Sequence, residues 1–224
     1  MTATLFVALV VVMAVVVFGA LYRAGAGLGV IAGIGVIYLA VPAFLASRGA
    51  LDRYNPLPAP ALVMVLVLTV ITLTITLSQV GRRVNNAIGL AALVGYQAFR
   101  IPVEWLLHRL YQEGVIPVEM TYAGRNFDIV SGLTAAALGL WLARGRRSLG
   151  LVFAWNVLGL ALLANIVTIA VLSTPVPFRQ FTDGPANLLP SLMPYVWLPS
   201  FLVQLALAGH VLVFRRLWSP GQVR

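Results

Sequence analysis

Long apolar stretches separated by short polar connections dominate this sequence, and they restrict it to one class of fold. Only 9% of its 224 residues are charged, whereas 61% are hydrophobic. Soluble domains carry charge at about a quarter of their positions. A bilayer core roughly 30 Å thick requires about 20 apolar residues in one helix. We therefore predict an all-α polytopic membrane protein, with residues 1–224 forming a single transmembrane domain.

Seven stretches approach this length, and we expect each of them to form a transmembrane helix. They cover about residues 3–22, 27–46, 60–79, 85–101 or beyond, 127–143, 149–172 and 195–214. No Lys or Arg precedes the first stretch, which is also longer than the apolar part of a signal peptide. The sequence therefore predicts a retained first helix rather than a cleaved signal.

The arginines predict the orientation of these helices, because cytoplasmic loops of membrane proteins carry an excess of basic residues. One set of alternate connections, together with the C-terminus, carries Arg23, Arg82, Arg83, Arg144, Arg146, Arg147, Arg215, Arg216 and Arg224. The opposite side carries Arg48, Arg53, Arg109, Arg125 and Arg179, with Arg100 near its surface, and all six acids: Asp52, Glu104, Glu113, Glu119, Asp128 and Asp183. We therefore predict an N-terminus outside and a C-terminus in the cytoplasm of a bacterial inner membrane.

Composition also excludes several classes of cofactor and partner. The sequence has no cysteine and no lysine, which excludes disulfides, thiolate metal sites and lysine Schiff bases. Its two histidines are not spaced as metal ligands, so we expect neither a metal site nor another cofactor. The net charge of +9 does not indicate a nucleic-acid partner, because the arginines sort by membrane side. The expected partner is the lipid bilayer.

Residues 100–128 are the most polar part of the chain and the predicted functional region. They contain four of the six carboxylates and one of the two histidines. If the fourth helix continues to Gln112, a polar stripe follows one face of it. At 100° per residue this stripe contains Gln97, Arg100, Glu104, His108, Tyr111 and Gln112. Ionisable groups at membrane depth tend to face the bundle interior or a cavity, so the stripe predicts a polar pocket.

Pro102 supports a second interpretation of the same region, because proline interrupts a helix but fits its first position well. Residues 85–101 would then span alone, and a short amphipathic helix from Pro102 to Glu113 would lie at the outer interface. Its apolar face would contain Val103, Leu106, Leu107 and Leu110, opposite Glu104, His108, Arg109 and Gln112. Both interpretations predict a break at Pro102 after the fourth span, and both place the polar groups on the outer side.

The start of the fifth helix also has two interpretations. Asn126 and Asp128 are suited to capping its free amides. Alternatively, Asp128, followed by Ser131 and Thr134, faces Arg100 and Glu104 across a cleft. We expect Arg125 to pair with Glu119 or Glu104, Asn165 to lie near Arg100, and Asn156 to meet His210. The ligand-binding candidates are thus Arg100, Glu104, His108, Arg125, Asn126, Asp128 and Asn165.

Three functions follow from this pattern. The first is a transport or binding protein whose outer pocket accepts a small molecule or an ion. The second is a non-catalytic membrane subunit or receptor whose outer loops bind a partner, with its buried charges satisfying one another. The third is an interfacial lipid-modifying enzyme that uses Glu104 or His108 as a general base. We favour a non-enzymatic function, because the sequence contains no evident nucleophile or metal set.

Overall fold

The computed structural model describes residues 1–218, which are helical and contain no strand. Arg224, one of the arginines assigned to the cytoplasmic side, lies outside the described residues. The α-helices are α1 (Thr2–Arg23), α2 (Leu28–Gly35), α3 (Val41–Ser47), α4 (Pro60–Leu77), α5 (Gln79–Ala87), α6 (Leu90–Gly95), α7 (Arg100–Gln112), α8 (Asp128–Ala143), α9 (Leu149–Ser173) and α10 (Val203–Leu217). The π segments are η1 (Val36–Ala40) and η4 (Leu198–Leu202), and the 3₁₀ segments are η2 (Tyr96–Phe99) and η3 (Val118–Met120).

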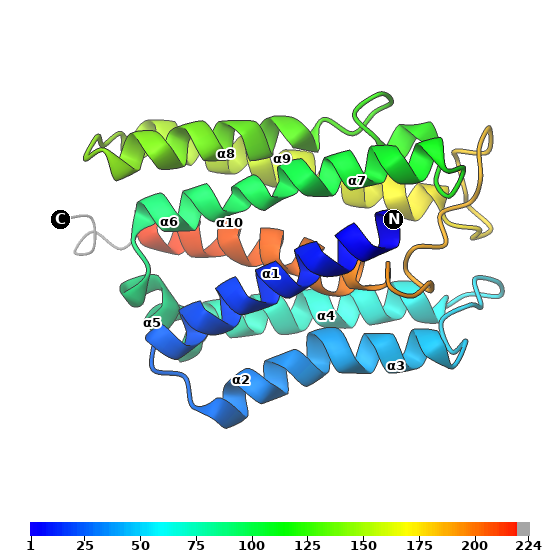
Figure 1. The fold of residues 1–224 in the computed structure, drawn as a ribbon, viewed down its shortest axis with the longest axis horizontal. Helices are drawn as coiled ribbons and strands as arrows, with labels where there is room; N and C mark the ends of the chain where they lie inside the picture. Colours follow the sequence, from blue (N-terminus) through cyan, green and yellow to red (C-terminus); the bar gives the residue numbers. More distant parts are fainter. Residues whose placement is uncertain (219–224) are drawn as a thin grey trace.

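Several of these segments join end to end into longer rods, which lie side by side in one layered bundle (Figure 1). Five rods within residues 1–218 are long and apolar enough to cross a membrane. They are Thr2–Arg23, Leu28–Ser47, Pro60–Leu77, Leu149–Ser173 and Leu198–Leu217. The predicted all-α class is confirmed, and the fold is consistent with a helical membrane protein.

Two further rods lie alongside these five. The α8 helix is apolar but has only 16 residues, and α6, η2 and α7 follow one another without interruption. The α6 part of this second rod lies next to α10 and its α7 part next to α1, while α8 lies alongside both parts (Figure 1). The rods at the predicted third and fourth segments are joined by the short helix α5, which the sequence analysis had not separated from them.

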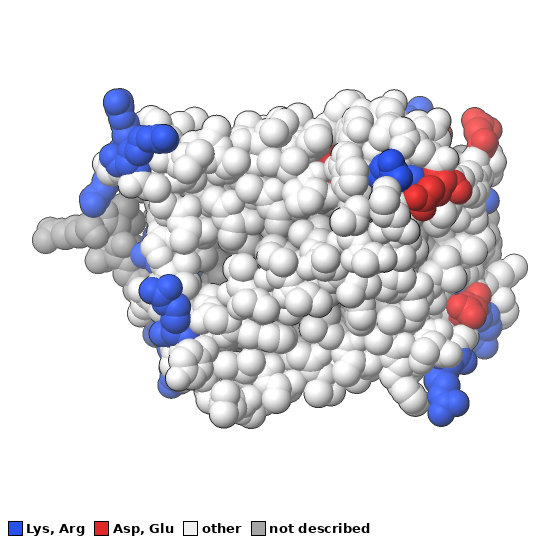
Figure 2. Space-filling model, in the orientation of Figure 1, with Lys and Arg blue, Asp and Glu red and all other residues white. Residues whose placement is uncertain are grey.

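Charged side chains gather at the two ends of the bundle and leave a broad, almost uncharged band between them (Figure 2). We call one of them the arginine end; its described charged residues are Arg23, Arg82, Arg83, Arg144, Arg146, Arg147, Arg215 and Arg216. The opposite, mixed-charge end has both basic and acidic side chains on its surface. This separation of charge is the pattern of a chain whose middle band lies in hydrocarbon.

The break predicted at Pro102 comes one turn earlier, and the predicted helix from Pro102 to Glu113 corresponds to α7, which continues the same rod instead of lying apart from it. Pro102 is the third residue of α7, which continues to Gln112. The irregularity instead comes one turn earlier, in η2. In a 3₁₀ turn the Ala98 carbonyl is directed to residue 101, so it does not need the amide hydrogen that Pro102 lacks. The chain therefore tightens before the proline instead of breaking at it.

The helices α6 and α8 approach each other closely because both are glycine at their contact. A Cβ atom added to Gly139 would lie 2.6 Å from the Gly95 Cα, closer than real Cβ atoms come. Small residues of this kind let the backbones of membrane helices pack closely. This contact fixes the spacing between α8 and the rod that begins with α6.

The two π segments also contact each other, and together they connect distant parts of the chain. Trp197 Nε1 donates to the Leu39 carbonyl at 3.0 Å, and Ser200 Oγ donates to the Tyr38 carbonyl at 3.2 Å. Widened π turns leave backbone carbonyls available to such partners and are frequent near functional sites. The η4 segment leads directly into α10, which lies in the middle of the bundle (Figure 1).

We predict that Gly139→Ala destabilises the protein by about 1–3 kcal/mol, because the added methyl group must push α8 away from Gly95. The measurement is thermal unfolding of the purified chain in a neutral detergent. Gly150→Ala in α9 is the matched control, since a Cβ atom there meets nothing within 4 Å. Equal melting temperatures for the two variants would contradict the close contact.

Candidate functional site

Arg100 lies at the centre of the most polar region in the bundle. Only 2% of its surface is exposed, and its guanidinium binds Asp128 of α8 in a two-pronged ion pair. Nε donates to Oδ2 at 2.6 Å, and NH2 donates to Oδ1. This is the one ion pair between side chains within residues 1–218. Bidentate contacts of this kind fix the orientation of both groups as well as attracting them.

The remaining nitrogen of Arg100 connects three more groups. NH1 donates to Ser131 Oγ at 2.7 Å and lies 3.0 Å from His210 Nε2 and 3.4 Å from the Gly159 carbonyl. Gly159 must be glycine here, because a Cβ atom would lie 2.5 Å from His210 Cε1. One side chain on α7 is thereby bonded to α8, α9 and α10.

The hydrogen bonds around His210 define its tautomer. A guanidinium can only donate, so His210 Nε2 accepts from Arg100 and the ring proton sits on Nδ1. Nδ1 then donates to Asn156 Oδ1 at 2.8 Å, while Asn156 Nδ2 donates to the His210 carbonyl at 3.0 Å. The predicted contact between Asn156 and His210 is therefore present, and it holds a neutral imidazole beside Arg100.

Glu104 lies one helical turn beyond Arg100 and is only 1% exposed. Its Oε2 accepts from Asn126 Nδ2 at 2.6 Å. The same Asn126 nitrogen donates to the Met120 carbonyl at 3.0 Å, and Asn126 Oδ1 accepts from the Asp128 amide at 3.0 Å. The predicted cap at the start of α8 is thus supplied by Asn126. Glu104 Oε1 accepts no hydrogen bond from any residue in the described part of the chain.

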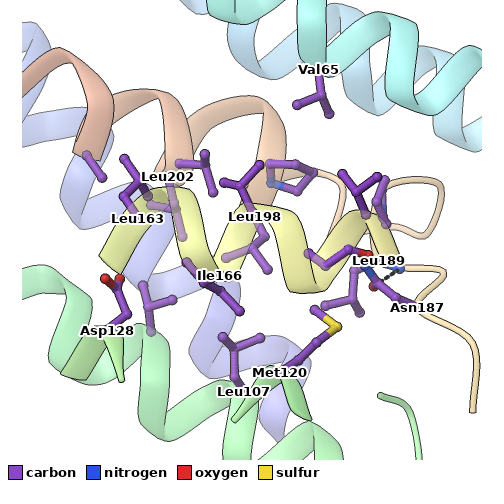
Figure 3. Close-up of a pocket in the computed structure, with 18 of the residues that line it drawn as sticks. Val65, Leu107, Met120, Asp128, Leu163, Ile166, Asn187, Leu189, Leu198 and Leu202 are labelled. Atoms are coloured by element: carbon purple, nitrogen blue, oxygen red, sulfur yellow. Dashed lines mark hydrogen bonds between the residues drawn. The ribbon is translucent and has the colours of Figure 1, made fainter. Parts of the chain in front are cut away.

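A cavity of about 90 Å³ adjoins these residues (Figure 3). Arg100, Glu104 and Asp128 form part of its lining, and most of the remaining wall is apolar. The apolar wall comes from α4, α7, α9, η4 and α10 and includes Val65, Leu107, Leu163, Ile166, Leu198 and Leu202. In Figure 3 the Asp128 carboxylate points from its helix towards α9 and the cavity. The arrangement is a small apolar chamber with charged groups at one side, as expected for a ligand site.

Four of the seven candidate residues are outside the lining of this cavity: His108, Arg125, Asn165 and Asn126, of which Asn126 contacts the lining residue Glu104. His108 stacks on Tyr122 with ring centroids 4.5 Å apart, and its Nε2 lies 3.3 Å from Gln112 Nε2. Arg125 is exposed over the Phe181 ring, so the predicted pairing of Arg125 with Glu119 or Glu104 is wrong. An aromatic face replaces the carboxylate as its partner.

Asn165 also lies outside the lining of the cavity, and it connects two segments. Its Nδ2 donates to the Arg125 carbonyl at 2.9 Å, which joins α9 to the loop before α8. Of the residues expected to face Arg100 with Asp128, Ser131 does so, but Thr134 does not. Thr134 Oγ1 accepts from Trp155 Nε1 at 3.2 Å instead.

Sequence reasoning missed the contact between His210 and Arg100. Both interpretations of the fourth helix placed Arg100 on the outer side, and one of them ended the span at residue 101. The rod formed by α6, η2 and α7 continues to Gln112, so Arg100 lies near its middle. At 1.5 Å per residue, the added turns move Arg100 to the depth of His210. The signal was available in the polar stripe that continues past Pro102.

A second cavity, of about 440 Å³, lies nearer the arginine end. It is lined by residues of α1, α2, η1, α4, α5, α6, η2, η4 and α10, among them Arg23, Tyr38, Thr72, Thr76, Tyr96 and Gln204. The first cavity touches α4 at Leu62 and Val65, whereas this one touches it at Thr72, Ile75 and Thr76. The two chambers thus contact different turns of one helix, roughly 10–20 Å apart along its axis.

The fold and the site together define an all-α chain of membrane-protein character with buried ionisable groups beside a cavity. Residues 57–218 match the family described as "Domain of unknown function (DUF8737)", and the chain belongs to this family. No curated protein and no solved structure matches the chain. The matched range contains the Arg100 network and most of the residues that line both cavities.

We predict that Asp128→Asn destabilises the protein by about 3–5 kcal/mol, because it leaves the buried Arg100 charge without its counter-ion. Thermal unfolding in detergent measures the effect. Asp183→Asn, at an exposed loop position, is the matched control and is expected to unfold at the wild-type temperature. A double variant with Arg100→Met and Asp128→Leu should recover part of the loss, since it removes both charges. A double variant that is no more stable than Asp128→Asn would show that the unpaired Arg100 charge is not the cause of the loss.

Proposed function

We propose that this chain is an integral membrane protein that binds a small molecule or ion in its first cavity and carries it across the bilayer. The proposal includes seven membrane spans, an N-terminus outside and a C-terminus in the cytoplasm of a bacterial inner membrane. The first cavity would then open from the outer half of the membrane, and the second from the cytoplasmic half. The site residues would be Glu104, Arg100 and Asp128.

The seven-span proposal rests on rod length and on charge. Five rods have the length and composition of membrane spans, and the rod Leu90–Gln112 is long enough at about 1.5 Å per residue. The α8 helix is shorter, but it packs against both α7 and α9 and has few exposed polar groups. The positive-inside rule assigns the arginine end of the bundle to the cytoplasmic side of the membrane.

The observation that carries the binding proposal is the Glu104 carboxylate. One of its oxygens is held by Asn126, and the other takes no hydrogen bond from residues 1–218. This oxygen is therefore free to accept a hydrogen bond from a ligand in the cavity that Glu104 helps to line.

The two cavities support transport of the ligand as well as its binding. They contact different turns of α4, and buried side chains of Leu68, Phe201 and Leu202 lie in the core of the same region. The η4 segment contributes residues to both chambers: Leu198 and Leu202 line the first, and Phe201 lines the second. A small change at this π segment would alter the separation between them.

The second candidate is a non-catalytic membrane subunit, and one specific observation favours it. Arg100 is fully engaged by groups of its own chain, since all three of its nitrogens have partners. Such a network would hold α7, α8, α9 and α10 together without any ligand. In that case the outer loops would meet a partner and the cavity would be a packing defect.

The natural absence of cysteine permits a direct test of topology. We predict that Thr182→Cys reacts with a membrane-impermeant maleimide added to intact spheroplasts. Ala26→Cys should react only after the membrane is opened, because its loop belongs to the arginine end. Reaction of Ala26→Cys in intact cells, with Thr182→Cys protected, would reverse the proposed orientation.

A cavity-filling variant tests ligand binding. The probes are butylammonium, 1-butanol and butyrate, because a cavity of about 90 Å³ is smaller than the roughly 150 Å³ cavity that holds benzene. We expect at least one probe to raise the melting temperature of the wild-type chain and to have no effect on Ala170→Phe, whose ring would enter the cavity. Ala161→Phe, on an exposed position of the same helix, is the matched control.

Transport is then measured as uptake of the stabilising probe into proteoliposomes. We expect uptake by the wild-type chain and by Ala161→Phe, and loss of uptake in Ala170→Phe. Stabilisation without uptake would leave a binding protein rather than a carrier. No stabilisation by any of the three probes would favour the non-catalytic subunit.

A further inference from the structure

Within the described residues, the buried carboxyl groups that line the first cavity outnumber its buried basic groups by one. Arg100 contributes one positive charge, and Asp128 contributes one negative charge directly opposed to it. Glu104 adds a second negative charge in the same buried region. The three groups together therefore carry an excess of one negative charge when both carboxylates are ionised.

No side chain near Glu104 supplies the missing positive charge. Arg100 is the one basic residue in the lining of the cavity, and its nitrogens are occupied by Asp128, Ser131 and His210. Asn126, the partner of Glu104, is a neutral amide. His210 accepts from Arg100 and is neutral in that arrangement.

The cavity wall restricts the kind of ligand that can pair with Glu104. Apart from its charged groups, the lining of the cavity is mostly aliphatic and aromatic side chains, including Phe99, Leu163 and Ile166. Residues 1–218 contain no group of three His, Asp or Glu side chains placed to hold a metal ion. A positive group attached to a short apolar body satisfies both the carboxylate and the wall.

We infer that the first cavity binds a small organic monocation, with an ammonium group on Glu104 Oε1 and a short hydrocarbon body against α4, α9 and α10. This inference deepens the proposed function and rests on it. Asn126 holds the other carboxylate oxygen, and Glu104 is one of the residues that line the cavity. Arg100 cannot attract an anion there, because Asp128 already neutralises it.

Three probes of equal chain length separate the chemical classes. Butylammonium is positive, 1-butanol is neutral and butyrate is negative, and each is titrated into the purified full-length chain while its melting temperature is recorded. We expect butylammonium alone to stabilise the wild-type protein. Glu104→Gln should weaken its apparent affinity by about tenfold to a hundredfold, the range for losing a hydrogen bond to a charged group.

Glu104→Gln keeps the shape of the side chain and can still accept from Asn126, so we expect it to fold. Glu119→Gln in η3 is the matched control, because it removes the same charge outside the lining of the cavity. Its affinity for butylammonium should equal that of the wild-type chain. The comparison of probes on the wild-type protein stands even if Glu104→Gln gives little folded material.

The results separate failure of this inference from failure of the proposed function. Equal stabilisation by 1-butanol and butylammonium, lost in Ala170→Phe, would contradict the inference that the ligand is a cation. It would still support a binding site in the cavity. Stronger stabilisation by butyrate would overturn the cation and assign the site to Arg100. An absence of stabilisation by all three probes would overturn both, and equal weakening in Glu104→Gln and Glu119→Gln would overturn the role of Glu104.

Discussion

The ion pair between Arg100 and Asp128 is the interaction on which the rest of the bundle depends. In surroundings of low polarity an isolated charge costs many kcal/mol, so neither group can be buried without the other. Because Arg100 also bonds Ser131 and His210, satisfying its charge fixes the relative positions of α7, α8 and α10. Close approach of α9 follows, since its glycine at 159 leaves room for the imidazole.

This network also explains why polar groups cluster at one depth of the bundle while the surface around them stays apolar. Several polar side chains in it are held by two or more neighbours, as Asn126 is by Glu104, Met120 and Asp128. Satisfied networks of this kind specify one arrangement of helices, because a shift of any member leaves others unpaired. The apolar packing of the remaining core is less selective, since lipid is as apolar as the side chains.

Composition and charge pattern predicted the fold class and the positions of the long apolar rods, because both depend on local properties of the chain. They also predicted that Asp128 and Ser131 face Arg100, and that Asn156 meets His210. The position of the break could not be predicted from Pro102 alone, because the effect of a proline depends on whether the preceding turn can become 3₁₀. The partners of Arg125 and Thr134 depend on which helices are neighbours, and a single sequence carries little information on that.

Asn126 gives the cavity a mechanical connection to the fold. Its Nδ2 donates to Glu104, and its Oδ1 accepts from the Asp128 amide, the first amide of α8. The side chain of the same Asp128 pairs with Arg100. The carboxylate beside the cavity and the beginning of α8 therefore share one planar amide group as their common hydrogen-bond partner.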